Sequence, residues 1–255
     1  MEKYLEHFPQ DEMFCRQLMD MKERVTERYV PLLTDFLNPH ERDVASSLIG
    51  KHQDVRIAFF GGIENAEMQR ALLYHVTDSY SLADFQISVL ALRYPHKFIH
   101  ITHRDVLGAL MNLGLKRELY GDIVVRDGEA YVACAKHVED YLQTHLTTIG
   151  KGKVSISPAS LPITRVEQFR KAQGTIASFR LDAILSEAFH LSRKEAMQRI
   201  QSNFVKVNYK EVVQTDFLCH NNDIISLRKH GRIKLVDLNY VNRKGKHVIE
   251  IWFYK

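Results

Sequence analysis

Apolar residues recur at helical spacing through the first fifty residues of the chain. An amphipathic helix is predicted by four apolar residues with charged ones between them: Met13, Leu18, Met21 and Val25. Asn38-Pro39 has the composition of a turn that starts a second, short helix. The apolar run over residues 55–60 predicts a strand, followed by a Gly61-Gly62 turn that lacks the spacing of a phosphate-binding loop. Residues 1–80 are therefore expected to form a mostly helical N-terminal domain.

The pattern changes near Phe85, where short apolar runs begin to alternate with helical ones. FQISVLALRY, GDIVV and EAYVACA predict strands, and Asp127-Gly128 between the last two is a strong signal for a hairpin turn. HRDVLGALMNLGL and KHVEDYLQTHLTTIG have helical periodicity, and KVSISP predicts a last strand. The order β-α-β-β-α-β is that of a ferredoxin-like, RRM-like domain, expected over residues 81–160. This topology alone does not establish a function.

The stretch SPASLPITRVEQFRKAQGT contains two prolines and little periodicity, so residues 161–178 are expected to be a linker. A helix then begins, with an apolar stripe at Leu181, Ile184, Leu185, Ala188 and Phe189. Ser192, followed three residues later by Glu195, predicts a capping box that opens another helix. Residues 179–255 are expected to form a C-terminal domain, in which packing rather than base stacking is expected of Trp252 and Tyr254.

Two cations occupy the first turn of the helix that begins after Ser192. Arg193 and Lys194 lie where the helix dipole is positive, and acidic residues would be more stabilising there. Free backbone amides and two cations at one helix end make a good phosphate-binding site. The alternative is that Glu195 offsets the repulsion and that both side chains simply extend into solvent.

The charge of the chain is divided unevenly. Residues 180–255 contain 14 Lys and Arg against 8 Asp and Glu, a net charge of +6, so the remaining residues carry −2. Such asymmetry indicates a nucleic-acid-binding end, although a well-solvated basic surface would have the same composition.

The cysteines, the histidines and the lengths of the apolar runs argue against a metalloprotein and against a membrane protein. The three cysteines lie far apart, as is typical of reduced thiols, and the thirteen histidines lack the spacing of metal ligands, so neither a metal nor a cofactor is expected. The charged N-terminus and the absence of any run of roughly 18 apolar residues predict a cytoplasmic protein with no membrane partner. His103-Arg104-Asp105 is similar to a kinase catalytic loop, but Leu110 stands where the metal-binding Asn of that loop would be.

The C-terminal pattern resembles the S4 RNA-binding domain. The residues that carry this resemblance span about 55 positions: Arg180-Leu181-Asp182, Leu185, Ser192-Arg193, Ala196, Ile200, Val205, Val207-Asn208, Asp223, Ile225-Ser226 and Gly231-Arg232. One departure is Tyr209, where many members of the family have Gly. A bulky residue resists the positive φ of the usual turn at this position.

Further upstream, residues 102–125 (THRDVLGALMNLGLKRELYGDIVV) precede the S4-like segment in an arrangement that resembles the YlmH family of Gram-positive bacteria. This resemblance implies an α+β protein with a helical N-terminal region, a central RRM-like domain and a C-terminal S4 domain. It also implies a role on the large ribosomal subunit, in the handling of stalled peptidyl-tRNA complexes during ribosome-associated quality control. A link to the cell-division gene cluster is implied as well.

Asp182 raises the question of catalysis, because pseudouridine synthases use an aspartate in an Arg-Leu-Asp context and often carry an S4 domain. In those enzymes a large catalytic domain follows the S4 module, whereas only 75 residues follow Arg180 here. An acid is also favourable in the first turn of a helix, and Asp182 could orient Arg180 or Arg193. A non-catalytic, monomeric RNA-binding adaptor is therefore expected, and the family resemblance implies large-subunit rRNA of the ribosome and tRNA as its partners. The alternatives are an RNA-modifying enzyme and a cell-division scaffold that binds proteins.

The candidate site residues fall into three sets. Contacts to RNA phosphates are expected from Arg180, Ser192, Arg193, Lys194, Lys206, Arg228, Lys229 and Arg232. Orienting or structural roles are expected for Asp182, Glu195 and Asn208. A second RNA-binding surface is expected on the central domain at His103, Arg104, Lys116 and Arg117, where ordinary surface charge would explain the same residues.

Overall fold

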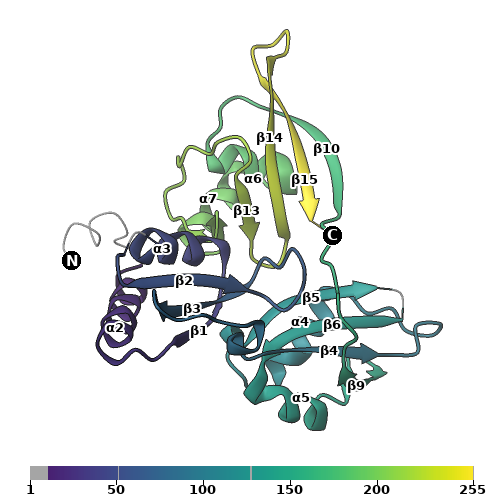
Figure 1. Ribbon diagram of the computed structural model, residues 1–255. Coiled ribbons are helices and arrows are strands. Elements are labelled where there is room, and N and C mark those ends of the chain that lie inside the picture. The colour runs from purple at the N-terminus through teal and green to yellow at the C-terminus, as the bar shows by residue number, and fades with distance from the viewer. Residues whose placement is uncertain (1–10, 51, 127, 255) are drawn as a thin grey trace. The chain divides into compact units, whose positions relative to one another are not determined.

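The computed structural model describes residues 11–50, 52–126 and 128–254, which form two compact units (Figure 1). Unit 1 extends to Arg165, and unit 2 begins at Val166. Both units combine helices with antiparallel sheets, so the protein belongs to the mixed α/β class. Within the described ranges, no helix is both long enough and apolar enough to cross a membrane.

The first part of unit 1 packs two helices, α2 (Glu12–Arg28) and α3 (Pro39–Ile49), against a three-stranded sheet. In sheet order the strands are β1 (Leu32–Leu37), β3 (Gln69–His75) and β2 (Val55–Phe60). The apolar stripe of α2 is buried at Cys15, Leu18, Met21 and Val25, whereas Met13 is exposed. Asn38 and Glu41 cap α3 with reciprocal hydrogen bonds, and Pro39 opens the helix as expected.

This sheet corrects the expectation that residues 1–80 are mostly helical. Strand β1 pairs with β3, so that Leu33 lies opposite Leu72, and β3 in turn pairs with β2. Such pairing joins segments that are far apart in the chain, and no local periodicity reports it. Residues 1–10 of the expected domain lie outside the described residues.

The second part of unit 1 has the predicted order of strands and helices. The elements are β4 (Ile87–Arg93), α4 (His103–Asn112), β5 (Tyr120–Arg126), β6 (Glu129–Ala135), α5 (Glu139–His145) and β9 (Ser155–Pro158). The strands are antiparallel in the order β5-β6-β4-β9. β5 and β6 form the predicted hairpin, with Arg126 opposite Glu129, and Asp127 of its turn lies outside the described residues.

Several short elements connect these strands and helices. They are the 3-10 helices η2 (Leu82–Phe85), η3 (Arg117–Leu119) and η4 (Lys136–Val138), and the paired strands β7 (Thr148–Ile149) and β8 (Gly152–Lys153).

Both faces of the four-stranded sheet are buried, which explains the continuous apolar run of β4. On one face, Leu90 and Leu92 pack with the core residues of α4 and α5. On the opposite face, Val89 and Ala91 pack with Phe36 of β1. The two sheets of unit 1 therefore share a core, and the expected domain boundary between residues 80 and 81 lies inside one compact unit.

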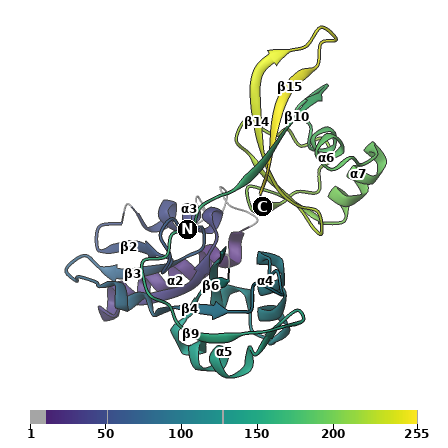
Figure 2. The ribbon, with the colours of Figure 1, turned by 90° about the vertical axis from the view of Figure 1, so that its right-hand side faces the viewer.

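Unit 2 has two helices, α6 (Leu181–Phe189) and α7 (Arg193–Gln201), on one face of a six-stranded antiparallel sheet (Figure 2). In sheet order the strands are β10 (Phe169–Ile176), β15 (His247–Tyr254), β14 (Gly231–Val241), β13 (Ile224–Leu227), β11 (Val205–Val207) and β12 (Lys210–Glu211). The core between the two layers contains residues of both helices with alternate residues of the strands: Leu181, Ile184, Leu185, Ala188, Ala196, Ile200, Val205, Ile225, Ile233, Ile249 and Ile251.

Strand β10 corrects the expected linker over residues 161–178. It pairs with β15 along its whole length, from Phe169 opposite Tyr254 to Ile176 opposite His247. Because β15 is the last strand of the chain, the pairing that makes residues 169–176 a strand depends on a segment that the local pattern does not include.

Candidate nucleic-acid interface

Helix α7 begins with the predicted capping box. Ser192 Oγ accepts a hydrogen bond from the amide of Glu195 at 3.2 Å, and Glu195 Oε2 accepts from the amide and the hydroxyl of Ser192 at 2.9 and 2.8 Å. The backbone bond from Ser192 and then the hydroxyl bond lower the pKa of Glu195 below its ordinary value. The hydroxyl group of Ser192 therefore donates its proton within the capping box, and the same bonds hold the Glu195 side chain against the helix end.

Asp182 connects the first turn of α6 to the first turn of α7. Its carboxylate accepts hydrogen bonds from Arg180 Nε at 3.2 Å and Nη2 at 3.1 Å. It also accepts two from Arg193 Nη2, at 3.0 and 2.9 Å. Bonds between a guanidinium and a carboxylate are charge-assisted and are stronger than those between neutral groups. Asp182 thus holds two arginine side chains together, and we call these three residues the arginine clamp.

The ionisation of Asp182 follows from this geometry. Burial raises the pKa of its carboxyl group, but the hydrogen bonds from Arg180 and Arg193, together with their positive charges, outweigh burial and lower the pKa below its ordinary value. The bond to Asp182 in turn raises the pKa of Arg180. Asp182 is therefore ionised and Arg180 protonated at neutral pH.

The clamp leaves both guanidinium groups accessible to a ligand. The side chain of Asp182 is 2% exposed, whereas those of Arg180 and Arg193 are 37% and 53% exposed. A guanidinium has five N–H donors, and the bonds to Asp182 use only some of them. Lys194 is exposed next to Arg193 in the first turn of α7. We call Arg180, Arg193 and Lys194 the helix entrance, a cationic surface whose two arginines are held in place by Asp182.

The other expected phosphate contacts lie elsewhere in unit 2. Arg228 and Lys229 are exposed in the turn between β13 and β14, and Arg228 Cζ lies 5.3 Å from the ring centroid of Phe204, beyond the end of α7. Lys206 and Arg232 alternate with buried strand residues, so they lie on the sheet face opposite the two helices. The expected cations therefore form three groups: the helix entrance, the β13–β14 turn and the outer face of the sheet.

The turn between β11 and β12 forms despite the departure at Tyr209. Asn208 has φ 48° and Tyr209 has φ 71°, so both central residues of this two-residue turn are left-handed. The Asn208 side chain donates to Asp223 Oδ1 at 2.8 Å and accepts from the amide of Ile224 at 2.9 Å. These bonds connect the turn to the start of β13, so Asn208 supports the local fold at this place.

The four residues of the expected second surface lie at the two ends of α4. His103 and Arg104 are in its first turn, and Lys116 and Arg117 follow its C-terminal end, roughly 13 Å away along a ten-residue helix. Arg117 is partly buried, its Nη1 donates to a backbone carbonyl of β5 at 2.6 Å, and burial lowers its pKa. These residues therefore do not form one cluster, and the guanidinium group of Arg117 already has a hydrogen-bond acceptor within unit 1.

Comparison with known proteins identifies the family. Two family models match the chain, "YlmH, N-terminal" over residues 10–77 and "Putative RNA-binding domain in YlmH" over residues 81–162. The chain belongs to the YlmH family. A relative from Bacillus subtilis (strain 168), the "Ribosome-associated protein quality control protein P2", is 34% identical over 247 residues, which cover 94% of this chain and 95% of that protein. The resemblance to the YlmH family is therefore confirmed.

A solved structure of the YlmH family is also similar. The "Cell division protein ylmH from Streptococcus pneumoniae" matches with a TM-score of 0.52 and 30% identity, over 59% of this chain and 92% of that chain. The structural match thus covers part of the chain, whereas the match to the Bacillus relative covers nearly all of it.

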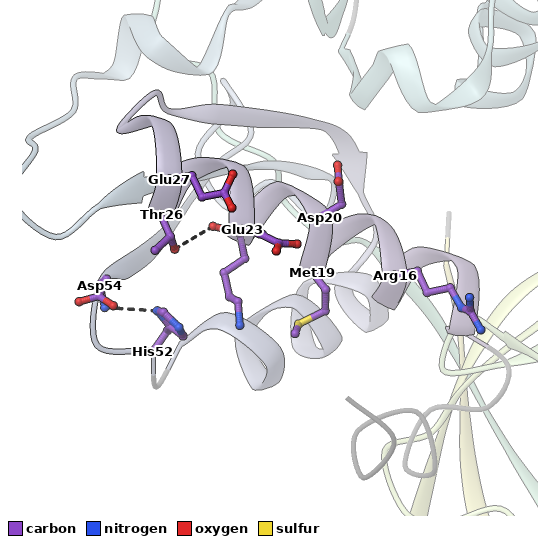
Figure 3. Close-up of a pocket in the computed structure, with 9 residues that line it drawn as sticks. Arg16, Met19, Asp20, Glu23, Thr26, Glu27, His52 and Asp54 are labelled. Carbon is purple, nitrogen blue, oxygen red and sulfur yellow. Dashed lines mark hydrogen bonds between the residues drawn. The ribbon is translucent and has the colours of Figure 1, made fainter.

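One pocket of this YlmH family member lies along α2 and the segment after α3 (Figure 3). It is lined by Arg16, Met19, Asp20, Lys22, Glu23, Thr26, Glu27, His52 and Asp54. Its four carboxylates repel phosphate, so it is a poor site for RNA. In the described parts of the chain, no three His, Cys, Asp or Glu side chains are arranged to hold a metal ion.

Sequence reasoning missed one surface of this YlmH protein. Phe169, Lys171 and Lys234 lie with Trp252 and Tyr254 on the outer face of the unit 2 sheet. The alternation of Trp252 and Tyr254 with Ile251 and Phe253 showed that two faces exist. It did not show which face the helices cover, nor that β10 adds a lysine and a phenylalanine to the other one.

Proposed function

We propose that this protein is a non-catalytic RNA-binding adaptor, and that the helix entrance of unit 2 binds the phosphate backbone of structured RNA. The observation that carries the proposal is the arginine clamp. A buried, ionised Asp182 orients two accessible arginines beside Lys194 at the start of α7. Phosphate contacts of this kind position a protein on a folded RNA without reading its bases.

Two domain assignments belong to this proposal. Unit 2 is an S4 domain, supported by its helix pair, the strand over residues 205–207 and the clamp, which are formed by the residues that carry the resemblance. The second part of unit 1 is a ferredoxin-like domain, supported by the strand order β5-β6-β4-β9 with α4 and α5 on one face. RRM modules bind RNA on the open face of their sheet, and here that face is covered. RNA binding by this domain would therefore use its helical side, where His103 and Arg104 begin α4 and Lys116 follows its end.

The cellular role proposed is on the large ribosomal subunit, in quality control of stalled peptidyl-tRNA complexes. It is supported by the name of the Bacillus relative and by the description of the family model over residues 81–162. The uneven charge agrees with an RNA partner, because residues 166–255 contain 16 Lys and Arg against 9 Asp and Glu. The proposed partners are large-subunit rRNA and tRNA, bound by a monomer in the cytoplasm through the helix entrance, with Arg228, Lys229, Lys206 and Arg232 as outlying contacts.

The geometry of Asp182 favours an orienting role over catalysis. Its carboxylate is buried, and both oxygens accept hydrogen bonds from the two guanidinium groups, four in all. Neither oxygen is therefore well placed to react with an RNA base. Asp182→Asn is therefore expected to leave the base modifications of cellular RNA unchanged. A modification that disappears in cells carrying this variant would favour the enzyme instead.

The proposal is tested by the salt dependence of binding to a structured large-subunit rRNA fragment. About five phosphate contacts predict a slope of log affinity against log salt of roughly −3.5 to −4.5, and Arg193→Ala with Lys194→Ala should flatten it by up to about two units. The matched control is Arg24→Ala with Arg28→Ala, which removes the same charge from exposed positions of α2. If both double variants had the same slope, the helix entrance would not be part of the interface.

The name of the Streptococcus structure favours a second candidate, a cell-division scaffold that binds proteins. The double variant at the helix entrance separates the two functions. A strain that carries it should lose ribosome association; a strain that keeps normal ribosome association and divides abnormally would support the scaffold.

A further inference from the structure

The outer face of the unit 2 sheet combines aromatic rings with cations. The helices α6 and α7 cover the face formed by Ile233, Leu235, Ile249 and Ile251. The alternate residues of the same strands point to the other side. They include Phe169, Lys171, Lys206, Arg232, Lys234, Trp252 and Tyr254, which we call the aromatic face.

Strand register places these residues in two rows across the sheet. In the first row Lys206 is opposite Ser226, Ser226 is opposite Arg232, and Tyr254 is opposite Phe169. In the second row Lys234 and Lys171 lie on either side of Trp252. Each row thus joins cations and rings that come from strands far apart in the chain.

The rings and cations of the aromatic face are in direct contact. Lys171 Nζ lies 3.8 Å from the ring centroid of Trp252, and Lys234 Nζ lies 5.6 Å from it. Arg232 Cζ lies 4.2 Å from the ring centroid of Tyr254, and Phe169 contacts both rings at 5.2 and 4.8 Å. The side chains of Trp252, Tyr254 and Phe169 are only partly buried.

The charge of the aromatic face favours an anionic ligand. Its four cations are accompanied by the carboxylates of Glu211 and Glu250, and both carboxylates have partners. Glu211 lies 3.6 Å from Lys206, and Glu250 accepts a hydrogen bond from Trp252 Nε1 at 2.8 Å. Lys171 and Lys234, which flank Trp252, therefore stay available for an anion, next to rings that can stack on a flat partner.

We propose that the aromatic face binds unpaired nucleotides of a single-stranded RNA segment. Unpaired bases have exposed π-faces that stack on aromatic side chains, whereas a duplex hides them. An exposed cation–π contact is weaker than the stacking of a base on a ring, so a base can displace Lys171 from Trp252. The displaced ammonium then binds the adjacent phosphate. This site is separate from the helix entrance, which binds the backbone of folded RNA, and either can exist without the other.

The fluorescence of Trp252 tests the proposal directly, because Trp252 is the single tryptophan of the chain. A short oligouridylate is titrated into the full-length protein, and the same strand paired with its complement serves as the duplex. The single strand should quench the emission saturably, and the duplex should bind about tenfold more weakly at this site. Binding of a labelled single strand without any change in Trp252 emission would overturn the proposal, as would equal quenching by the duplex.

Variants separate stacking from charge. Measured with a labelled oligouridylate, Trp252→Phe should keep affinity within about threefold, whereas Trp252→Leu should lose about tenfold. Lys171→Ala with Lys234→Ala should also lose about tenfold, and the control Arg24→Ala with Arg28→Ala should lose much less. If Trp252→Leu bound as well as Trp252→Phe, or if the lysine pair behaved like its control, the site would be refuted. Arg193→Ala with Lys194→Ala should still show quenching, so failure of the helix entrance is distinguishable from failure of the aromatic face.

Discussion

Two helices cover one face of the four-stranded sheet in unit 1, and two helices likewise cover one face of the six-stranded sheet in unit 2. The opposite faces of these two sheets differ in what covers them. In unit 1, Val89 and Ala91 of β4 are buried under Phe36 of the N-terminal sheet. In unit 2, Trp252 and its neighbours lie on a face that no element of the same unit covers among the described residues. The sheet of the proposed ferredoxin-like domain therefore lacks the open surface that RRM modules use, whereas the sheet of unit 2 has rings and cations on its open face. Topology alone thus identifies neither of the two proposed RNA-binding surfaces.

The largest loss of stability is expected from a substitution at Phe36, which covers the second face of the four-stranded sheet in unit 1. Phe36 is 1% exposed and lies against Gly121, where an added Cβ would be 2.6 Å from the ring. Phe36→Ala should lower the free energy of unfolding of unit 1 by about 3–5 kcal/mol. Trp252→Ala should cost only about 1 kcal/mol, because its ring is partly exposed. Urea unfolding followed by circular dichroism measures both, and equal losses would mean that the two faces do not differ as described.

Asp122 of unit 1 and Asp182 of unit 2, both buried, extend the comparison to the pH dependence of stability. Asp182 has a lowered pKa, so its stabilisation is present above the unfolded pKa of about 3.9 and is lost as the pH falls through the folded value. Burial raises the pKa of Asp122, although the amides of Glu67 and Met68 and then Arg165 lower it in part. Its contribution is present below the unfolded pKa and is lost as the pH rises through the folded value.

Asparagine variants check these opposite signs. Asp182→Asn should destabilise unit 2 by about 1–2 kcal/mol near neutral pH, since charge-assisted bonds are lost, and should reduce the loss of stability in acid. Asp122→Asn should not reduce the loss in acid. Chemical unfolding of each variant over a pH series gives the slopes, and the same acid slope in both variants would contradict the assignment.

The smallest effect, a slight loss of RNA affinity, is expected from substitutions in the first turn of α4. This turn has the same local pattern as the first turn of α7. Thr102 and Asp105 form a capping box around His103 and Arg104, but no buried aspartate holds Arg104 within the described residues. Since a flexible side chain loses more entropy on binding, His103→Ala with Arg104→Ala should weaken binding to structured rRNA by about threefold or less. The change at Arg193 and Lys194 should weaken it by about tenfold or more. The reverse order would make the second part of unit 1 the main RNA interface.

The sequence by itself determined the features that depend on neighbouring residues. The capping box of Ser192 and Glu195, the apolar stripe of α6 and the hairpin around residue 127 follow from spacing and turn chemistry that act within a few residues. Residues 102–125, placed ahead of the motif over residues 180–232, also pointed to the family. Asp182 was recognised as a residue that could orient an arginine, although its contact with both was visible only in the structure.

The tertiary structure alone decided what depends on distant residues. β10 is a strand because it pairs with β15, and the register of that pair brings Lys171 into contact with Trp252. In unit 1, the second face of the four-stranded sheet is buried because Phe36 packs against it. The same register places Lys206 and Arg232 on the face opposite Arg193, although all three lie in one sequence motif. Because side chains alternate between the two faces of a strand, the sequence motif shows which residues share a face of the sheet. Only the packing of α6 and α7 determines which of the two faces remains uncovered.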